Sequence, residues 1–263
     1  MGIIKNIKVI EFCKKKKPLI CLTAYTKYMA EILDKYCDLI LVGDSLGMVV
    51  YGEQNTSSVS LQTMINHGAA VRKGVLKSLL VVDMPKGSYE KSVNQALRNA
   101  KKILKQTQCD AVKLEGGVEI KTIIKTLVKN NIPVMGHIGL LPQQVINPSD
   151  YRVKGRTKNE EKKIIKDFMA VQKSGAFSVV IEAIPAILAN KLCKISKIKT
   201  IGIGASNKCD GQVLVTEDML GFFDKTPKFV KKYTSLKAHI SKSVKKYSSD
   251  VLSRKFPNNK YTY

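Results

Sequence analysis

Short runs of apolar residues, many of them β-branched, alternate along this chain with longer amphipathic stretches, and no other feature narrows the possible folds as much. The apolar runs that form candidate strands are Leu19–Thr23, Leu39–Gly43, Leu79–Asp83, Ala111–Leu114, Pro133–His137, Ser178–Glu182, Thr200–Ile203 and Gln212–Val215. The amphipathic stretches that form candidate helices include Tyr28–Tyr36, Leu61–Leu76, Ser92–Gln106, Glu119–Asn130 and Asn159–Lys173. Nearly continuous apolar strands joined by helical crossovers predict a parallel sheet that is covered on both faces.

The number of strand–helix units decides between two kinds of parallel sheet. Eight units in 263 residues favour an α/β fold of the closed (β/α)8 TIM barrel type over an open, doubly wound sheet. A dinucleotide-binding sheet needs the motif G-x-G-x-x-G after its first strand, whereas AYTKYM follows the first strand here. No linker points to a second domain. Residues 1–263 are therefore predicted to form a single barrel domain with a short N-terminal extension and a helical tail from Asp218 to Tyr247.

The net charge of +24 raises the question of nucleic-acid binding. Only five of the 45 basic residues are arginine, the side chain that recognises bases and phosphates through paired hydrogen bonds. The lysines are spread along the whole chain, and the absence of Trp leaves few rings for stacking on bases. We expect solvated lysine surfaces and no nucleic-acid partner. The alternative is a basic RNA-binding protein, whose affinity would fall steeply with salt.

Cysteine spacing and hydropathy bear on the cellular compartment. The six cysteines form no C-x-x-C pair and no zinc-like pattern, and most lie in or beside apolar segments, which is typical of reduced core residues. The first residues, MGIIKNIKVIEF, are interrupted by lysine, unlike a signal peptide. No apolar run approaches the roughly 18 residues that span a membrane. We expect a cytoplasmic protein without a membrane partner.

Carboxylates end several of the predicted strands, and this is the most informative pattern for function. Asp44 follows LILVG, Asp83 ends LLVVD, Glu115 ends AVKLE and Glu182 ends SVVIE. Because the active sites of barrel enzymes lie at the carboxyl ends of the strands, these side chains are predicted to meet at one rim. A single acid at such a position is equally well explained as a helix N-cap, but four acids on one face are harder to explain in this way.

Carboxylates that lie close together repel one another, so a cation is expected among them. Oxygen ligands without paired His or Cys select a hard ion, Mg²⁺ before zinc. Mg²⁺ keeps open positions that the carboxylate and ketone oxygens of a 2-oxo acid can fill, and this polarises the ketone and stabilises the enolate formed on loss of a proton. A carboxylate that does not bind the metal can then act as the base.

Four further features each allow two interpretations. His137, in MGHIGL, either donates a hydrogen bond to a bound oxo acid or is structural. Lys113 points to the same side of its strand as Glu115 and either forms a Schiff base or pairs with a carboxylate. The segment Gly202–Ser206 suits either a phosphate or a tight turn. The irregular segment Leu141–Arg156 is either a lid over the site or a mobile surface loop.

Eight segments, in order along nearly the whole chain, resemble ketopantoate hydroxymethyltransferases. They are VGDSLGMVVYG (Val42–Gly52), VVDMPKGSY (Val81–Tyr89), AVKLEGG (Ala111–Gly117), PVMGHIGLLPQ (Pro133–Gln143), IEAIP (Ile181–Pro185), TIGIGAS (Thr200–Ser206), CDGQVLV (Cys209–Val215) and TPKFVKKY (Thr226–Tyr233). The resemblance implies an enzyme that joins 3-methyl-2-oxobutanoate to the one-carbon unit of the co-substrate 5,10-methylenetetrahydrofolate. The product, 2-dehydropantoate, leads to pantothenate and coenzyme A. The resemblance also implies a cytoplasmic homo-oligomer, a decamer of two pentamers.

The same resemblance implies roles for individual residues. The Mg²⁺ site corresponds to Asp44, Asp83 and Glu115, the last through water. The positions that match substrate-binding residues are Asp44, Ser45, Asp83 and Lys113, and Glu182 matches the proton acceptor.

The sequence departs from the family pattern at four positions, none of which matches a metal or base position. Lys86 replaces a usual Phe, Ser206 the second glycine of GIGAG, Thr26 an acid after TAY, and Leu141 a usual Thr. These changes affect the expected shape of the pocket mouth and the folate contacts. A carbon–carbon lyase of the phosphoenolpyruvate mutase or isocitrate lyase type shares the barrel and the enolate chemistry, but the cysteine-bearing catalytic loop of those enzymes is not found here. An inactive relative is the other alternative, although every catalytic position is intact.

Overall fold

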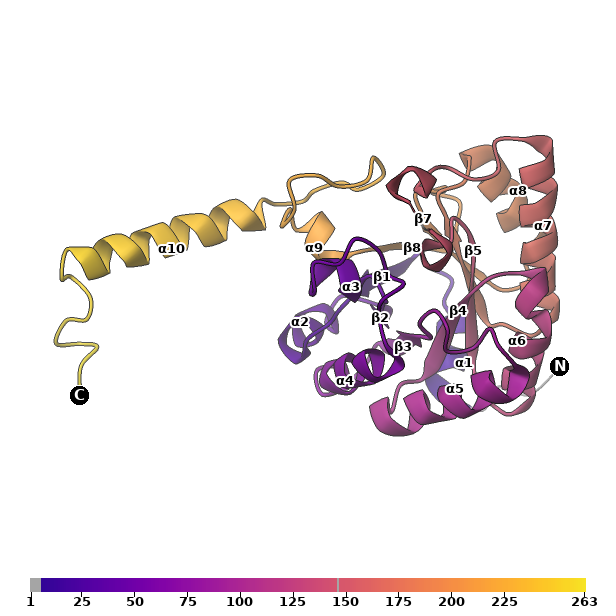
Figure 1. Ribbon diagram of the computed structural model, residues 1–263, viewed down its shortest axis with the longest axis horizontal. Helices are drawn as coiled ribbons and strands as arrows, with labels where there is room; N and C mark the ends of the chain where they lie inside the picture. Colours follow the sequence, from indigo (N-terminus) through magenta and orange to yellow (C-terminus); the bar gives the residue numbers. More distant parts are fainter. Residues whose placement is uncertain (1–5, 146) are drawn as a thin grey trace. The chain divides into compact units, whose positions relative to one another are not determined.

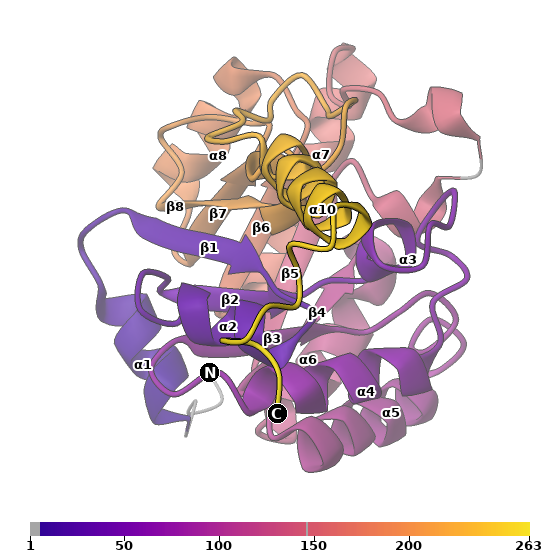
Figure 2. The ribbon, with the colours of Figure 1, turned by 90° about the vertical axis from the view of Figure 1, so that its left-hand side faces the viewer.

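The computed structural model describes residues 6–145 and 147–263, and within them eight parallel strands close into a barrel. The strands are β1 (Leu19–Thr23), β2 (Leu39–Val42), β3 (Leu79–Asp83), β4 (Ala111–Glu115), β5 (Val134–Gly139), β6 (Ser178–Glu182), β7 (Lys199–Ile203) and β8 (Gly211–Leu214). They pair in sequence order, and β8 closes against β1. Figure 1 and Figure 2 show helices around the outside of these strands. The predicted (β/α)8 TIM barrel is confirmed.

Two apolar cores explain why the strands are apolar on both faces. Leu39 and Leu41 of β2 belong to the cluster inside the barrel, whereas Ile40 and Val42 belong to the cluster between the barrel and its helices. β1 and β3 to β6 divide their apolar side chains between the same two clusters, whereas β7 and β8 contribute only to the cluster inside the barrel. A strand that faces two cores needs apolar residues at successive positions. The strands were predicted from this pattern of short apolar runs.

The helices of the barrel mostly agree with the predicted stretches. They are α1 (Ile7–Lys14), α2 (Lys27–Leu33), α3 (Leu46–Val49), α4 (Leu61–Arg72), α5 (Val93–Thr107), η1 (Val118–Ile120), α6 (Lys121–Lys129), η2 (Pro142–Gln144), η3 (Pro148–Asp150), α7 (Lys158–Lys173) and α8 (Ala186–Ile195). Side chains of Thr26, Ser60, Ser92 and Thr157 cap the amino ends of α2, α4, α5 and α7 by accepting backbone N–H bonds. At α7 the cap is a capping box with Glu160. These caps fix where four of the crossovers begin.

The N-terminal helix α1 belongs to the interior core. Its Val9 and Phe12 pack in the same cluster as the inward-facing residues of the strands, and the Phe12 ring meets the edge of Phe177 at 6.0 Å between centroids. The Lys8 ammonium donates to the carbonyls of Leu76 and Ser78, which both precede β3. The part of the chain predicted as a short extension is therefore helical and packed where it is described.

The chain divides into two compact units, Met1–Val215 and Thr216–Tyr263, and the barrel lies in the first. The second unit contains α9 (Thr216–Met219) and α10 (Leu236–Leu252) with an irregular segment between them. The helical tail expected from Asp218 to Tyr247 is therefore interrupted and ends later. The assignment of residues 1–263 to a single domain stays a prediction. No helix in the described ranges combines the length and apolarity needed to cross a membrane.

Candidate active site

The carboxyl ends of β2 to β6 carry the predicted site residues. Asp44 follows the end of β2, Asp83 ends β3, Lys113 and Glu115 lie at the end of β4, His137 lies in β5, and Glu182 ends β6. Because the strands are parallel, all of these positions are at the same rim of the barrel. Direct contacts, described next, join these side chains into one connected group.

Asp44, Asp83 and Lys113 form the first half of the group. The backbone N–H of Asp44 donates to Oδ2 of Asp83 at 3.1 Å, and Nζ of Lys113 lies 3.1 Å from the same oxygen. Burial raises the pKa of both carboxyls, and the charges of Asp83 and Glu115 raise the pKa of Asp44 further. Burial lowers the pKa of Lys113, but the three surrounding carboxylates outweigh it and raise that pKa. A Schiff-base lysine needs a lowered pKa, so these contacts favour the ion-pair role for Lys113.

His137 connects the two glutamates that form the second half. Its Nδ1 lies 3.3 Å from Oε1 of Glu115, and its Nε2 lies 3.0 Å from Oε2 of Glu182. Burial and the Lys113 ammonium lower the pKa of His137, but Glu115 and the hydrogen bonds to both glutamates raise it to about 9. Its Nδ1 also lies 3.3 Å from Nζ of Lys113, and this contact joins the two halves of the group. The Glu182 side chain is 13% exposed, against 4% or less for His137 and Glu115.

Two further polar residues enter the group although no role was predicted for them. Gln143, in η2, donates from its amide to Oδ2 of Asp44 at 2.7 Å. The Tyr89 hydroxyl donates to Oε1 of Gln143 at 2.8 Å and lies 3.0 Å from the Glu115 carbonyl oxygen. Both side chains are buried. A polar residue inside an otherwise apolar segment after a strand was the available signal, but it does not say where such a side chain points.

The carboxylates fit a hard divalent cation. Oδ1 of Asp83 is buried and accepts no hydrogen bond from the described residues. Burial raises the pKa of Asp44, and the charges of Asp83 and Glu115 raise it further, so a cation beside this carboxylate would favour its ionised form. Within the described ranges, no three or more His, Cys, Asp or Glu side chains are grouped so that together they could hold a metal ion. Mg²⁺ does not need such a cage, because it is commonly bound through one or two carboxylates, with water and substrate completing its shell.

The remaining predicted positions have contacts of their own. The Ser45 hydroxyl lies 2.8 Å from the hydroxyl of Tyr25, beside Asp44 in sequence. In the segment Gly202–Ser206, the Ser206 hydroxyl donates to Asn190, and the Ser206 carbonyl accepts from Gln212. Gly204 has φ +59°, the left-handed conformation of a tight turn. These contacts agree with the turn interpretation of this segment, and phosphate binding there stays a prediction.

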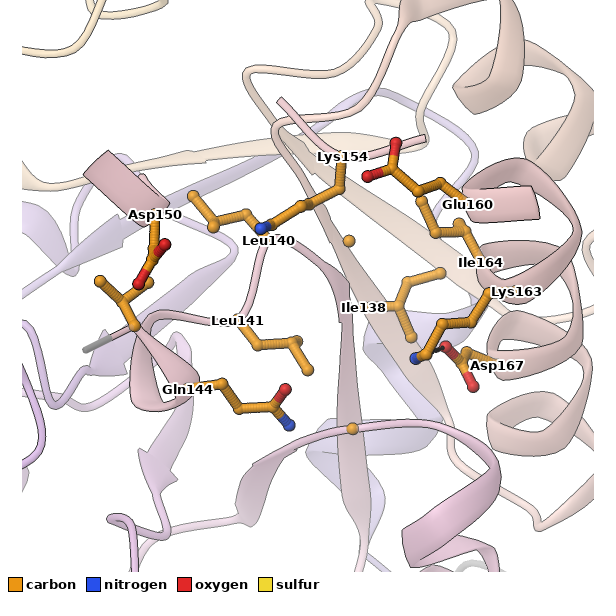
Figure 3. A pocket seen from close by; sticks show the side chains of 13 residues that line it. Ile138, Leu140, Leu141, Gln144, Asp150, Lys154, Glu160, Lys163, Ile164 and Asp167 are labelled. Atoms are coloured by element: carbon orange, nitrogen blue, oxygen red, sulfur yellow. Dashed lines mark hydrogen bonds and ion pairs between the residues drawn. The ribbon is translucent and has the colours of Figure 1, made fainter. Parts of the chain in front are cut away.

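A cavity of about 290 Å³ adjoins the rim between the loop after β5 and helix α7 (Figure 3). Its lining residues are Gly116, Ile138, Gly139, Leu140, Leu141, Gln144, Val145, Asp150, Lys154, Glu160, Lys163, Ile164 and Asp167. Gly116 directly follows Glu115, and Gly139 pairs with Glu182 across β5 and β6. The irregular segment after β5 therefore forms one wall of this cavity, next to the carboxylate group.

A barrel whose strand ends gather four carboxylates, a lysine and a histidine belongs to the (β/α)8 enzymes with their site at the carboxyl face. The family model of ketopantoate hydroxymethyltransferase matches residues 5–259. The chain belongs to this family and is a transferase.

Individual relatives agree with this assignment. The chain is 53% identical over 255 residues to the 3-methyl-2-oxobutanoate hydroxymethyltransferase of Rhizobium etli, covering 97% of this chain and 93% of that protein. It is 48% identical over 260 residues to the enzyme of the same name from Pelagibacter ubique, covering 98% of this chain and 100% of that protein.

Solved structures with the same fold are much more distant in sequence. A phosphoenolpyruvate phosphomutase from Streptomyces platensis subsp. rosaceus has a TM-score of 0.65 at 10% identity, over 94% of this chain and 87% of that one. A phosphonopyruvate hydrolase has a TM-score of 0.65 at 11% identity, over 98% of this chain and 93% of that one. At such identities these likenesses show the fold alone.

Proposed function

We propose that this chain transfers a hydroxymethyl group from 5,10-methylenetetrahydrofolate to 3-methyl-2-oxobutanoate, giving 2-dehydropantoate in pantothenate biosynthesis. The names of the relatives support this proposal. The observation that carries it is the connected group at the rim, in which a partly exposed Glu182 lies 3.0 Å from His137 and a hydrogen bond joins Asp44 to Asp83. Within this group, Glu182 is the candidate base, and Asp44 and Asp83 form the candidate metal site.

The residues of the group have separate roles in the proposed reaction. Mg²⁺, held by Asp44 and Asp83 with Glu115 acting through water, would polarise the ketone of the oxo acid and stabilise the enolate. Glu182 removes the proton from the carbon next to the ketone, because it is the carboxylate of the group most open to a substrate. That carbon then forms a bond to the one-carbon unit of the folate, water supplies the hydroxyl group of the product, and tetrahydrofolate leaves.

His137, Lys113 and Ser45 prepare the site for this chemistry. Nε2 of His137 lies 3.0 Å from Oε2 of Glu182, so the ring orients the carboxylate that takes the proton. Lys113 pairs with Asp83 and lowers the local negative charge before a cation and an anionic substrate enter. Lys113 and the Ser45 hydroxyl are the donors for the substrate carboxylate, and a hydrogen bond from His137 to the oxo acid stays a prediction. The assembly as a decamer and the cytoplasmic location, both implied by the family resemblance, are part of the same proposal.

The first half-reaction gives the direct test. In deuterated buffer with Mg²⁺, the methine proton signal of 3-methyl-2-oxobutanoate should disappear from the proton NMR spectrum. The variant Glu182→Gln removes the base and should slow this exchange by roughly 10²–10⁴-fold. The control variant Glu161→Gln changes an exposed glutamate paired with Lys191 and should exchange like the wild type. Exchange at the wild-type rate in Glu182→Gln would disprove the base assignment.

A further inference from the structure

Gln143 is a buried amide on a loop that is otherwise largely accessible. Gln143 lies in η2 (Pro142–Gln144), between β5 and α7. It is only 3% exposed, whereas the neighbouring Gln144 is exposed. Its Nε2 donates to Oδ2 of Asp44 at 2.7 Å and to the carbonyl oxygen of Met84 at 2.9 Å. Both protons of the amide are therefore directed at the ends of β2 and β3.

The other polar atoms of Gln143 are also engaged. Its Oε1 accepts from the hydroxyl of Tyr89 at 2.8 Å, and its backbone N–H donates to Oε2 of Glu115 at 3.0 Å. Gln143 thus forms hydrogen bonds to groups that lie at or just after the ends of three strands, β2, β3 and β4. A buried polar network of this kind is favourable only when every member is satisfied, so it specifies one position of the loop and one orientation of each carboxylate.

The chemistry of the amide explains why a glutamine suits this place. A lysine would bring a permanent positive charge against Asp44 and compete with a cation for it. A glutamate would add another anion to a group in which burial and the neighbouring carboxylates already raise the pKa of Asp44. An amide donates hydrogen bonds without adding net charge. It engages Oδ2 of Asp44, and the carboxylate would still hold a metal ion.

We propose that Gln143 is a positioning residue of the metal site: it orients the Asp44 and Glu115 carboxylates and fastens η2 to the ends of β2, β3 and β4. This inference rests on the proposed function, since it assigns to Gln143 a role toward the same cation. The departure Leu141 lies two residues before Gln143 and leaves the hydrogen bonds of Gln143 in place.

The test measures Mn²⁺ binding to the full chain by electron paramagnetic resonance, with the metal ion alone as the probe. Gln143→Leu keeps the size of the side chain and removes its hydrogen bonds. We expect Mn²⁺ affinity to fall by roughly 10–100-fold, the range seen when partners that orient metal ligands are removed. The matched control Gln144→Leu changes the exposed neighbour in the same helical turn and should bind Mn²⁺ like the wild type.

A second readout follows the loop itself. Limited trypsin digestion, analysed by mass spectrometry, reports cleavage after Arg152, which is exposed within the segment. Without metal, Gln143→Leu and Gln143→Glu should both be cut faster than the wild type. In Gln143→Glu, Mn²⁺ should restore protection, because the cation neutralises the added carboxylate. This second variant keeps the shape of the side chain, so it serves if Gln143→Leu does not fold.

The possible results separate this inference from the proposed function. A wild-type chain that binds no Mn²⁺ would disprove the metal site, and the inference with it. A wild type that binds Mn²⁺, with equal or tighter binding in Gln143→Leu, would overturn only the role of Gln143. Weaker binding together with faster cleavage after Arg152 would support both.

Discussion

At the scale of single residues, the imidazole of His137 gives the site a testable pH dependence. Its folded-state pKa is raised to about 9, against an ordinary value near 6.5. A raised pKa means that the protonated ring stabilises the fold fully below pH 6.5 and that this contribution is lost as the pH rises through 9. At about 1.4 kcal/mol per unit, the contribution is on the order of 3 kcal/mol.

Urea unfolding in EDTA at pH 7 and at pH 9.5 measures this effect. The wild type should lose stability between the two pH values by about 1–3 kcal/mol more than His137→Gln, which has no titrating ring. His239→Gln, in α10, is the matched control and should follow the wild type. An equal pH dependence in His137→Gln and the wild type would mean that the ring is not a cation between Glu115 and Glu182.

The sequence predicted the acids of the site better than the residues that hold them. Asp83, Glu115 and Glu182 end buried strands, so the period of the barrel alone brings them to one rim. Gln143 lies in the three-residue η2 and Tyr89 lies between β3 and α5, and neither segment has a period that relates a residue to the direction of its side chain. Their positions are decided by tertiary hydrogen bonds, which a single sequence does not display.

At the scale of elements, Asp34 joins the end of α2 to the start of β3. Its carboxylate accepts the backbone N–H groups of Leu76, Lys77 and Ser78 at 2.8–3.1 Å. Burial raises the pKa of Asp34, but these N–H donors outweigh it and leave that pKa below its usual range. A depressed pKa stabilises the fold above the unfolded value, near 3.9, and this contribution disappears as the pH falls through the folded value.

Replacing Asp34 by Asn should therefore lower the free energy of unfolding by about 1–3 kcal/mol at pH 7, as expected for lost hydrogen bonds to a charged group. The difference from the wild type should shrink as the pH is lowered from 5 to 3. Urea unfolding across this range measures both. Glu31→Gln, on the exposed face of the same helix, should have little effect. A difference that stays constant with pH would show that the charge of Asp34 is not what joins the two elements.

The strands could be predicted from the sequence because they face two cores. The ends of the helices could not be predicted in this way. The expected helix Leu61–Leu76 ends at Arg72, since a Cβ at Gly74 would meet the Lys27 carbonyl at 2.3 Å and the close approach requires glycine. The expected helix Glu119–Asn130 is divided into η1 and α6, and no side chain caps the start of α6. Both differences depend on neighbours distant in sequence, whereas the strand pattern is local.

At the scale of the whole molecule, the charge of +24 predicts opposite effects of salt on RNA binding and on the association of identical chains. Binding to RNA releases counterions, so its affinity falls as salt rises. Association of identical chains of this charge is opposed by mutual repulsion, and salt screens that repulsion, with a Debye length of about 10 Å at 0.1 M and about 3 Å at 1 M. Salt therefore acts on the two equilibria in opposite directions.

This contrast gives a prediction for the oligomer. A decamer of 29.2 kDa chains has a mass of about 292 kDa, and sedimentation velocity should find it at 500 mM NaCl, with the same or a smaller mass at 50 mM. Fluorescence anisotropy with a labelled RNA should show binding only at low salt, which is the behaviour of scattered lysines without a specific site. A 29.2 kDa monomer at both salt concentrations would contradict the oligomer. A mass that falls as salt rises would show that attraction between charges, and not apolar contact, holds the chains together.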